Sequence, residues 1–210
     1  MALLHDAQVT PTKLEALTAW VPGRPWAAGL DASALTAVGA YRFDDPDGEI
    51  GIEAILVRTA DGVLLQVPLT YRGAPLAGAQ DALVCTMEHS VLGSRWIYDG
   101  CADPVCVRAL VTATLTGGRE AELEYDSGDG IVPRKPTVRV TGSGSPGTAV
   151  PPIDAVSTVD GPGATVVSAG DLSLTVRRRL DGSADAAGET LRGTWRDQDE
   201  PVVLATVGPV

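Results

Sequence analysis

Residues 50–71, IGIEAILVRTADGVLLQVPLTY, carry the strongest structural signal in this chain of 210 residues. Two apolar runs, Ile50 to Arg58 and Val63 to Tyr71, lie on either side of the pair Asp61-Gly62. An Asp-Gly pair between apolar runs predicts a tight β-hairpin turn, because both turn positions favour a positive φ. We therefore expect two antiparallel strands here.

The rest of the sequence predicts further strands and two short helices. Thr12 and Glu15 form a capping box for a helix over residues 11–21, and Asp103 is placed to cap a second helix over residues 103–116. The 24 glycines and 15 prolines stand against one phenylalanine, which favours many short elements separated by turns. We expect an α+β fold with mostly antiparallel sheets. The remaining strands are predicted over residues 37–43, 82–91, 95–98, 121–125, 137–141, 165–168, 172–180, 189–195 and 202–207.

The segment GSGSPGTAVPP, residues 142–152, is the linker-like part of the sequence. It divides the chain into an expected α+β domain over residues 1–142, a linker over 143–152 and a β-strand segment over 153–210. A phosphate-binding loop would need a following helix whose N-terminal N–H groups hold the phosphate, and the sequence predicts none there. A linker is therefore the better interpretation.

Composition and charge exclude several classes of function. The net charge is −11, and an acidic surface repels phosphate backbones, so we expect no nucleic-acid partner. The sequence has no signal-peptide pattern and no apolar run near the ~20 residues of a membrane span, so we expect no membrane partner. Cys85, Cys101 and Cys106 lack zinc-ligand spacing. We expect a cytoplasmic protein with free thiols, no metal site and no cofactor.

Two groups of side chains are candidates for a ligand site. Trp26, Trp96 and Tyr98 can stack on sugar rings, although tryptophan in a protein this poor in phenylalanine is more often a core anchor. His89 and Asp99 are a candidate acid/base pair, although structural polar residues are the commoner explanation. Glu88 does not join them, because neighbouring residues of a strand face opposite sides.

Three motifs together resemble the N-terminal cap domain of actinobacterial maltokinases. They are Trp20-Val21-Pro22 with Trp26, the strand end Gln66-Val67-Pro68-Leu69, and Tyr98-Asp99 followed by Asp103-Pro104. Their order and spacing cover residues 10–115. The resemblance implies a small α+β unit with a curved antiparallel sheet. In the full kinase, this cap sits on the catalytic lobes that phosphorylate maltose with ATP. One departure is that Ala27-Ala28-Gly29-Leu30 lacks the basic residues usual after the tryptophan.

A fourth motif, DLSLTVRRRL at residues 171–180, resembles the kinase N-lobe strand that carries the nucleotide-binding lysine. The resemblance places Thr175 at the lysine position, and a neutral hydroxyl cannot neutralise ATP phosphates. Because the chain has 210 residues and ends at Val210, we expect no counterpart of the catalytic C-lobe of the kinase. The arginines at residues 177–179 are interpreted as a solvated strand face.

These observations predict a protein that is not an enzyme. The first hypothesis is a non-catalytic regulatory or scaffolding protein of trehalose, maltose or α-glucan metabolism, with a kinase or glucan enzyme as its protein partner. The alternative is a sugar- or oligosaccharide-binding module that uses Trp26, Trp96 and Tyr98. A small enzyme built on His89 and Asp99 is the third. A concave cleft lined by the aromatic residues favours the second hypothesis, and an exposed flat patch favours the first.

Overall fold

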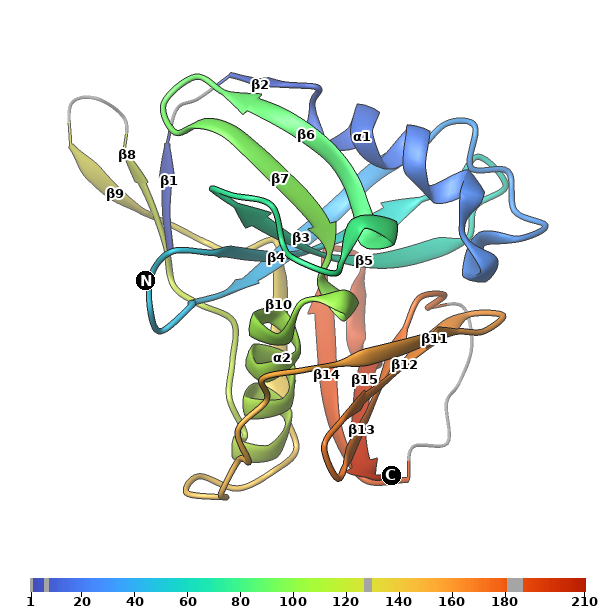
Figure 1. The fold of residues 1–210 in the computed structure, drawn as a ribbon, viewed down its shortest axis with the longest axis vertical. Coiled ribbons are helices and arrows are strands. Elements are labelled where there is room, and N and C mark those ends of the chain that lie inside the picture. Colours follow the sequence, from blue (N-terminus) through green and yellow to red (C-terminus); the bar gives the residue numbers. More distant parts are fainter. Residues whose placement is uncertain (1, 6–7, 127–129, 181–186) are drawn as a thin grey trace.

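The computed structural model describes residues 2–5, 8–126, 130–180 and 187–210. Its first sheet has six strands in the order β2-β6-β7-β5-β4-β3, and every neighbouring pair is antiparallel. This sheet forms the upper part of the molecule in Figure 1. Its strands are β2 (Val9–Thr10), β3 (Thr36–Phe43), β4 (Gly51–Arg58), β5 (Leu64–Arg72), β6 (Leu83–His89) and β7 (Gly93–Asp99).

The predicted hairpin of residues 50–71 is confirmed as β4 and β5, which pair from Gly51 with Tyr71 to Arg58 with Leu64. The turn is longer than the predicted two residues. Thr59 N donates to the Val63 carbonyl at 3.0 Å, and among the turn residues only Gly62 has a positive φ, +93°. Asp61 therefore does not take the left-handed conformation that a two-residue Asp-Gly turn requires.

The second sheet also has six strands, in the order β10-β14-β15-β13-β12-β11, all antiparallel. A three-stranded sheet, β1-β8-β9, contains the parallel pair β1 and β8. The fold is thus mostly β, with the mainly antiparallel sheets and two helices that the sequence predicts. These strands are β1 (Ala2–His5), β8 (Leu123–Asp126), β9 (Ile131–Arg134), β10 (Val138–Gly142), β11 (Ser157–Asp160), β12 (Ala164–Ala169), β13 (Leu172–Arg177), β14 (Glu189–Trp195) and β15 (Gln198–Pro209).

Both predicted helices are present, and short 3₁₀ turns flank them. α1 (Lys13–Trp20) starts with the predicted capping box of Thr12 and Glu15. α2 (Pro104–Thr116) is capped by Asp103, whose carboxylate accepts from Val105 N at 3.0 Å and binds Arg72 of β5 through two hydrogen bonds of 2.6 and 2.7 Å. The 3₁₀ turns are η1 (Val21–Gly23), η2 (Pro25–Ala27), η3 (Gln80–Ala82) and η4 (Gly100–Ala102). Within the described residues, no helix is long and apolar enough to span a membrane.

Two hydrophobic clusters lie on the two faces of the first sheet. α1 and the turns after it cover one face, where Leu17 and Trp26 pack on residues such as Val67. α2 packs between the other face and the second sheet, so that Leu56 and Leu110 share one cluster with Leu174. Figure 1 shows α1 above the first sheet and α2 beneath it, beside β10 and β14. The two large sheets therefore enclose a common core.

The segment predicted as a linker begins against the folded core. β10 precedes it and pairs with β14, so residues before 143 already belong to the second sheet. Ser143 N donates to the Thr190 carbonyl at 2.8 Å, and Gly144 N donates to the Thr114 carbonyl of α2 at 3.0 Å. The division into domains at residues 142 and 153 stays a prediction, but the strands on both sides of this segment are joined in one sheet.

Candidate functional site

A buried polar junction joins the two large sheets just after β13. There the chain leaves the second sheet, and Gln66 N of β5 donates to the Arg178 carbonyl at 2.8 Å. The Arg178 side chain is 0% exposed, and its Nη2 donates to Asp99 Oδ2 at 2.5 Å. Its guanidinium carbon lies 4.9 Å from the centre of the Trp26 ring, close enough for a cation–π interaction.

The buried Arg178 corrects the prediction of a solvated arginine face. Its side chain is not in solvent but fully buried, and it forms an ion pair with Asp99, which lies 79 residues away in the sequence. Burial by itself lowers the pKa of Arg178, but the charge of Asp99 and its hydrogen bond more than offset burial and raise the pKa above the ordinary value. Arg178 is therefore a permanent buried cation.

Asp99 serves structure in this arrangement, because both of its carboxylate oxygens are engaged. Oδ2 accepts from Arg178, and Oδ1 accepts from Cys101 N at 3.1 Å. His89 lies at the opposite end of the β6–β7 hairpin, where it pairs with Gly93, and its Nδ1 accepts from two backbone N–H groups of the turn. The structure therefore does not bring the predicted acid/base pair together.

The three aromatic residues predicted to stack on a sugar do not lie on the same face of the first sheet. Trp26 is 0% exposed and packs against Trp20, with 5.9 Å between the ring centres. Trp96 and Tyr98 alternate along β7 with Ile97, which packs in the same cluster as Trp26, so they face the other side of the sheet. Tyr98 is buried, and its hydroxyl accepts from Leu76 N at 3.0 Å. These aromatic side chains do not form one platform.

Gln66 provides a second polar connection between the sheets. Its Nε2 donates to the carbonyls of Arg177 and Leu204 at 2.9 and 3.0 Å, and its Oε1 accepts from the hydroxyl of Tyr41 at 2.9 Å. Gln66 and Tyr41 are both about 1% exposed. Together with Arg178, this network fixes the orientation of one sheet on the other, because buried polar groups are costly to leave unpaired.

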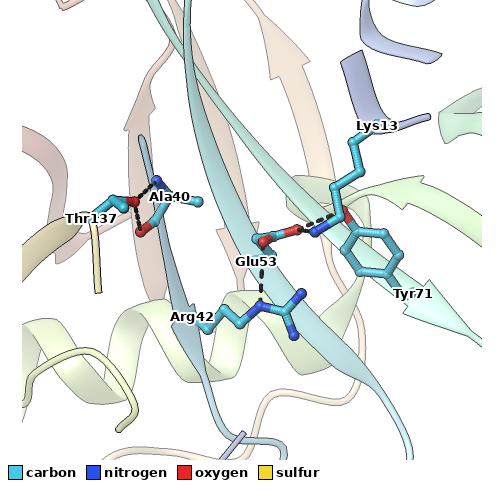
Figure 2. Close-up of polar contacts among 6 residues, drawn as sticks. All are labelled: Lys13, Ala40, Arg42, Glu53, Tyr71 and Thr137. Carbon is cyan, nitrogen blue, oxygen red and sulfur yellow. Dashed lines mark hydrogen bonds and ion pairs between the residues drawn. The ribbon is translucent and has the colours of Figure 1, made fainter. Parts of the chain in front are cut away.

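Glu53 is the centre of a charged cluster on the α1 side of the first sheet (Figure 2). Lys13 Nζ and the Tyr71 hydroxyl donate to Oε2 at 2.6 and 2.7 Å, and Arg42 Nε donates to Oε1 at 3.3 Å. Burial would raise the pKa of Glu53, but Arg42, Lys13 and the hydrogen bonds lower it to about 2. Glu53 is thus a charged structural anchor that fastens α1 to β3, β4 and β5.

Figure 2 also shows how the edge of the first sheet is closed at β3. The hydroxyl of Thr137 accepts from Ala40 N at 2.8 Å and donates to the Ala40 carbonyl at 3.1 Å. β10 follows immediately and crosses β3 at Gly39, where a Cβ atom would lie 2.8 Å from Val138 Cγ2. A residue without a side chain therefore permits this close crossing.

The outer face of the second sheet, turned away from α2, has an unusual charge for this acidic protein. Arg139, Arg177 and Arg192 lie on it, because they alternate along their strands with core residues. None of the three forms an ion pair with a described residue, and Asp199 is the sole acidic residue at the outward positions of the described strands. Most of the surrounding outward positions carry a hydroxyl group, among them Thr141, Ser168, Ser173, Thr175, Thr190, Thr194 and Thr206, and Val159 and Val166 add exposed apolar side chains.

A separate pocket of about 420 Å³ lies beside α2, between the helix, the end of β3 and residues 118–122. None of the residues predicted for a ligand site lines it. Among the described residues, no group of three or more His, Cys, Asp and Glu side chains is placed to hold a metal ion. Cys101 and Cys106 are buried, and burial raises the pKa of both thiols, so neither is a reactive thiolate.

The comparisons with known proteins bear on the first sheet above all. Residues 20–103 match the family model of the maltokinase N-terminal cap domain, and they run from the end of α1 to the cap of α2. The protein is thus cap-domain-like over this region, as the sequence motifs predicted. No curated protein matches the chain.

One solved structure with similarity is a glucosamine kinase in complex with glucosamine, ADP and inorganic phosphate. It is 15% identical to this chain, with a TM-score of 0.48. The match covers 96% of this chain and 41% of the kinase chain, so this chain spans about two fifths of that protein's length.

Proposed function

We propose that this protein is a non-catalytic regulatory or scaffolding module that binds an enzyme of maltose, trehalose or α-glucan metabolism. The link to this metabolism rests on the cap-domain match. The observation that carries the binding role is the outer face of the second sheet, with its many hydroxyls and its three arginines that form no ion pair with a described residue. Such a face suits a protein surface that carries carboxylates.

The rigid connection between the sheets supports a binding role for this face. Arg178 and Gln66 fix the second sheet to the cap-like sheet through buried hydrogen bonds. A preorganised surface loses little conformational entropy when a partner binds, so it binds more tightly than a flexible surface of the same area. The three buried or half-buried free thiols are compatible with a reducing compartment, and the proposal places the protein in the cytoplasm.

The proposal that the module is non-catalytic rests on Thr175 and its surroundings. Thr175 lies on the outer face, between Val166 of β12 and Thr206 of β15. A kinase needs carboxylate or amide groups on Mg²⁺ as well as a cation on the phosphates. Arg177 lies on the same face as Thr175, but Asp199 is the sole acidic residue at the outward positions of the described strands of this sheet. Calorimetry with Mg-ATP is expected to show no heat of binding, and a micromolar dissociation constant would overturn this part of the proposal.

The binding role is tested by affinity capture from the native host, followed by identification of the retained proteins. The wild type should retain an enzyme of maltose, trehalose or α-glucan metabolism, and Arg192→Glu should lose it because the charge of the face is reversed. Arg58→Glu is the matched control, since Arg58 is an exposed arginine at the end of β4 in the other sheet. Equal capture by Arg192→Glu and the wild type, or capture of no such enzyme, contradicts the proposal.

A further inference from the structure

The pocket beside α2 has the size of a site for a small molecule. Its volume of about 420 Å³ falls within the usual range for ligand pockets, roughly 300–1,000 Å³. Phe43, Val105 and Ala109 give it an apolar surface, and Phe43 is the aromatic residue among its lining side chains. Polar side chains from α2 and from residues 119–122 complete the lining.

The wall opposite α2 is held in place by hydrogen bonds to three different elements. Gly118 N donates to the Ala113 carbonyl of α2 at 2.8 Å. Glu120 Oε2 accepts from Val140 N of β10 at 2.7 Å, and Ala121 N donates to the Arg42 carbonyl of β3 at 2.8 Å. These hydrogen bonds hold residues 118–121 in place without a ligand. A ligand that binds would therefore not pay the entropy cost of ordering this wall.

The polar groups of the pocket point to the chemistry of its ligand. Two arginines, Arg108 and Arg119, stand against the carboxylates of Asp44, Glu120 and Glu122, and Arg108 also pairs with Asp154 at 3.8 Å, so the site disfavours an anion. Within the described residues, Arg119, Glu122 and Thr112 have no side-chain hydrogen bond or ion pair of their own. They present donors, acceptors and a hydroxyl that does both.

We propose that this pocket binds a neutral, hydroxyl-rich molecule of the size of a mono- or disaccharide. Hydroxyl groups both donate and accept, so they pair with Arg119 and Glu122 at the same time, whereas a purely apolar ligand would make no hydrogen bond with these exposed charged groups. The C–H surface of a sugar ring suits the apolar side formed by the half-buried Val105 and Ala109. The saccharide site is thus separate from Trp26, Trp96 and Tyr98. It does not rest on the partner proposed for the outer face.

The test is calorimetry or ligand-observed NMR with maltose and glucose as probes. The wild type should bind at least one of them, and Thr112→Trp, at an exposed position of α2, should abolish binding by filling the pocket. Glu122→Gln should weaken binding at least fivefold. The matched controls are Thr158→Trp on β11 and Glu200→Gln on β15, which lie in exposed positions outside the pocket and should bind as the wild type does.

Several results would overturn the inference. It is wrong if neither probe binds the wild type at about 50 mM, a concentration that would nearly saturate even a weak site with a dissociation constant of about 1 mM. It is also wrong if Thr112→Trp binds as well as its control, or if glucose 6-phosphate binds better than glucose. Arg192→Glu should keep sugar binding, so failure of the partner proposal and failure of this one give different results.

Discussion

Replacing Glu53 by glutamine removes the charge at the centre of the cluster in Figure 2 while keeping the shape of the side chain. Lys13 and Arg42 would then lose their carboxylate partner, and Lys13 would lose a contact of 2.6 Å. The pKa of Glu53 is about 2 in the folded protein, against an ordinary value of 4.5. A difference of this size corresponds to about 3 kcal/mol of stability at neutral pH.

The destabilisation by Glu53→Gln should depend on pH in a definite direction. A carboxyl whose folded-state pKa is depressed contributes its full stability above the unfolded value, near 4.5, and loses it as the pH falls through the folded value, about 2. At pH 7 the free energy of unfolding of the variant should therefore be about 3 kcal/mol lower than that of the wild type. At pH 3 the difference should shrink to roughly half, because the Glu53 carboxyl is then protonated in the unfolded wild type and its charge stabilises the folded state less.

Urea unfolding of both proteins at pH 7 and pH 3, followed by tryptophan fluorescence and circular dichroism, measures these differences. Glu49→Gln is the control, since Glu49 is exposed in the loop before β4 and should change stability by less than about 0.5 kcal/mol. The reasoning is refuted if Glu53→Gln costs less than about 1 kcal/mol at pH 7, or if its cost is the same at both pH values.

Three further substitutions test the packing of the sheets, each by urea unfolding against the wild type. Arg178→Met leaves the Asp99 carboxylate buried without its partner and should cost about 3–5 kcal/mol, while adding Asp99→Asn should recover part of that loss. Gly39→Ala places a Cβ atom 2.8 Å from Val138 and should cost about 1–3 kcal/mol. Leu110→Ala opens a cavity between the sheets and should cost about 2–5 kcal/mol. A cost below about 0.5 kcal/mol for any of them contradicts the packing described for that position.

Local signals predicted both helices and most strands of this fold, but they missed the short strands β1, β2, β9 and β11. The hairpin of β4 and β5 and the caps of α1 and α2 depend on residues within a few positions of one another, and the structure confirms them. The exact turn after Arg58 was not predicted correctly, because an Asp-Gly pair also fits a longer loop in which only Gly62 has a positive φ. Strand periodicity likewise could not show that β10 joins a sheet made mostly of later strands.

The candidate site was much harder to predict, because it depends on contacts between distant residues. Arg178 has the same sequence context as a solvated arginine, and only its contacts with Asp99 and Trp26 show that it is buried. Alternation along β7 indicates that Trp96 and Tyr98 share a face, but no sequence pattern places Trp26 on the opposite one. The pocket joins Phe43 to residues about 60–80 positions later, and no motif marks it.

We expect a protein partner to cover the outer face of the second sheet. Hydroxyl-radical footprinting of the chain, alone and in the captured complex, tests it most directly by measuring the exposure of individual side chains. Val159 and Val166 are exposed on this face, so both should be protected from oxidation in the complex. Val91 and Leu92, exposed in the β6–β7 turn of the other sheet, should be oxidised equally in both states. Protection of Val91 and Leu92 with unchanged oxidation of Val159 and Val166 would contradict it.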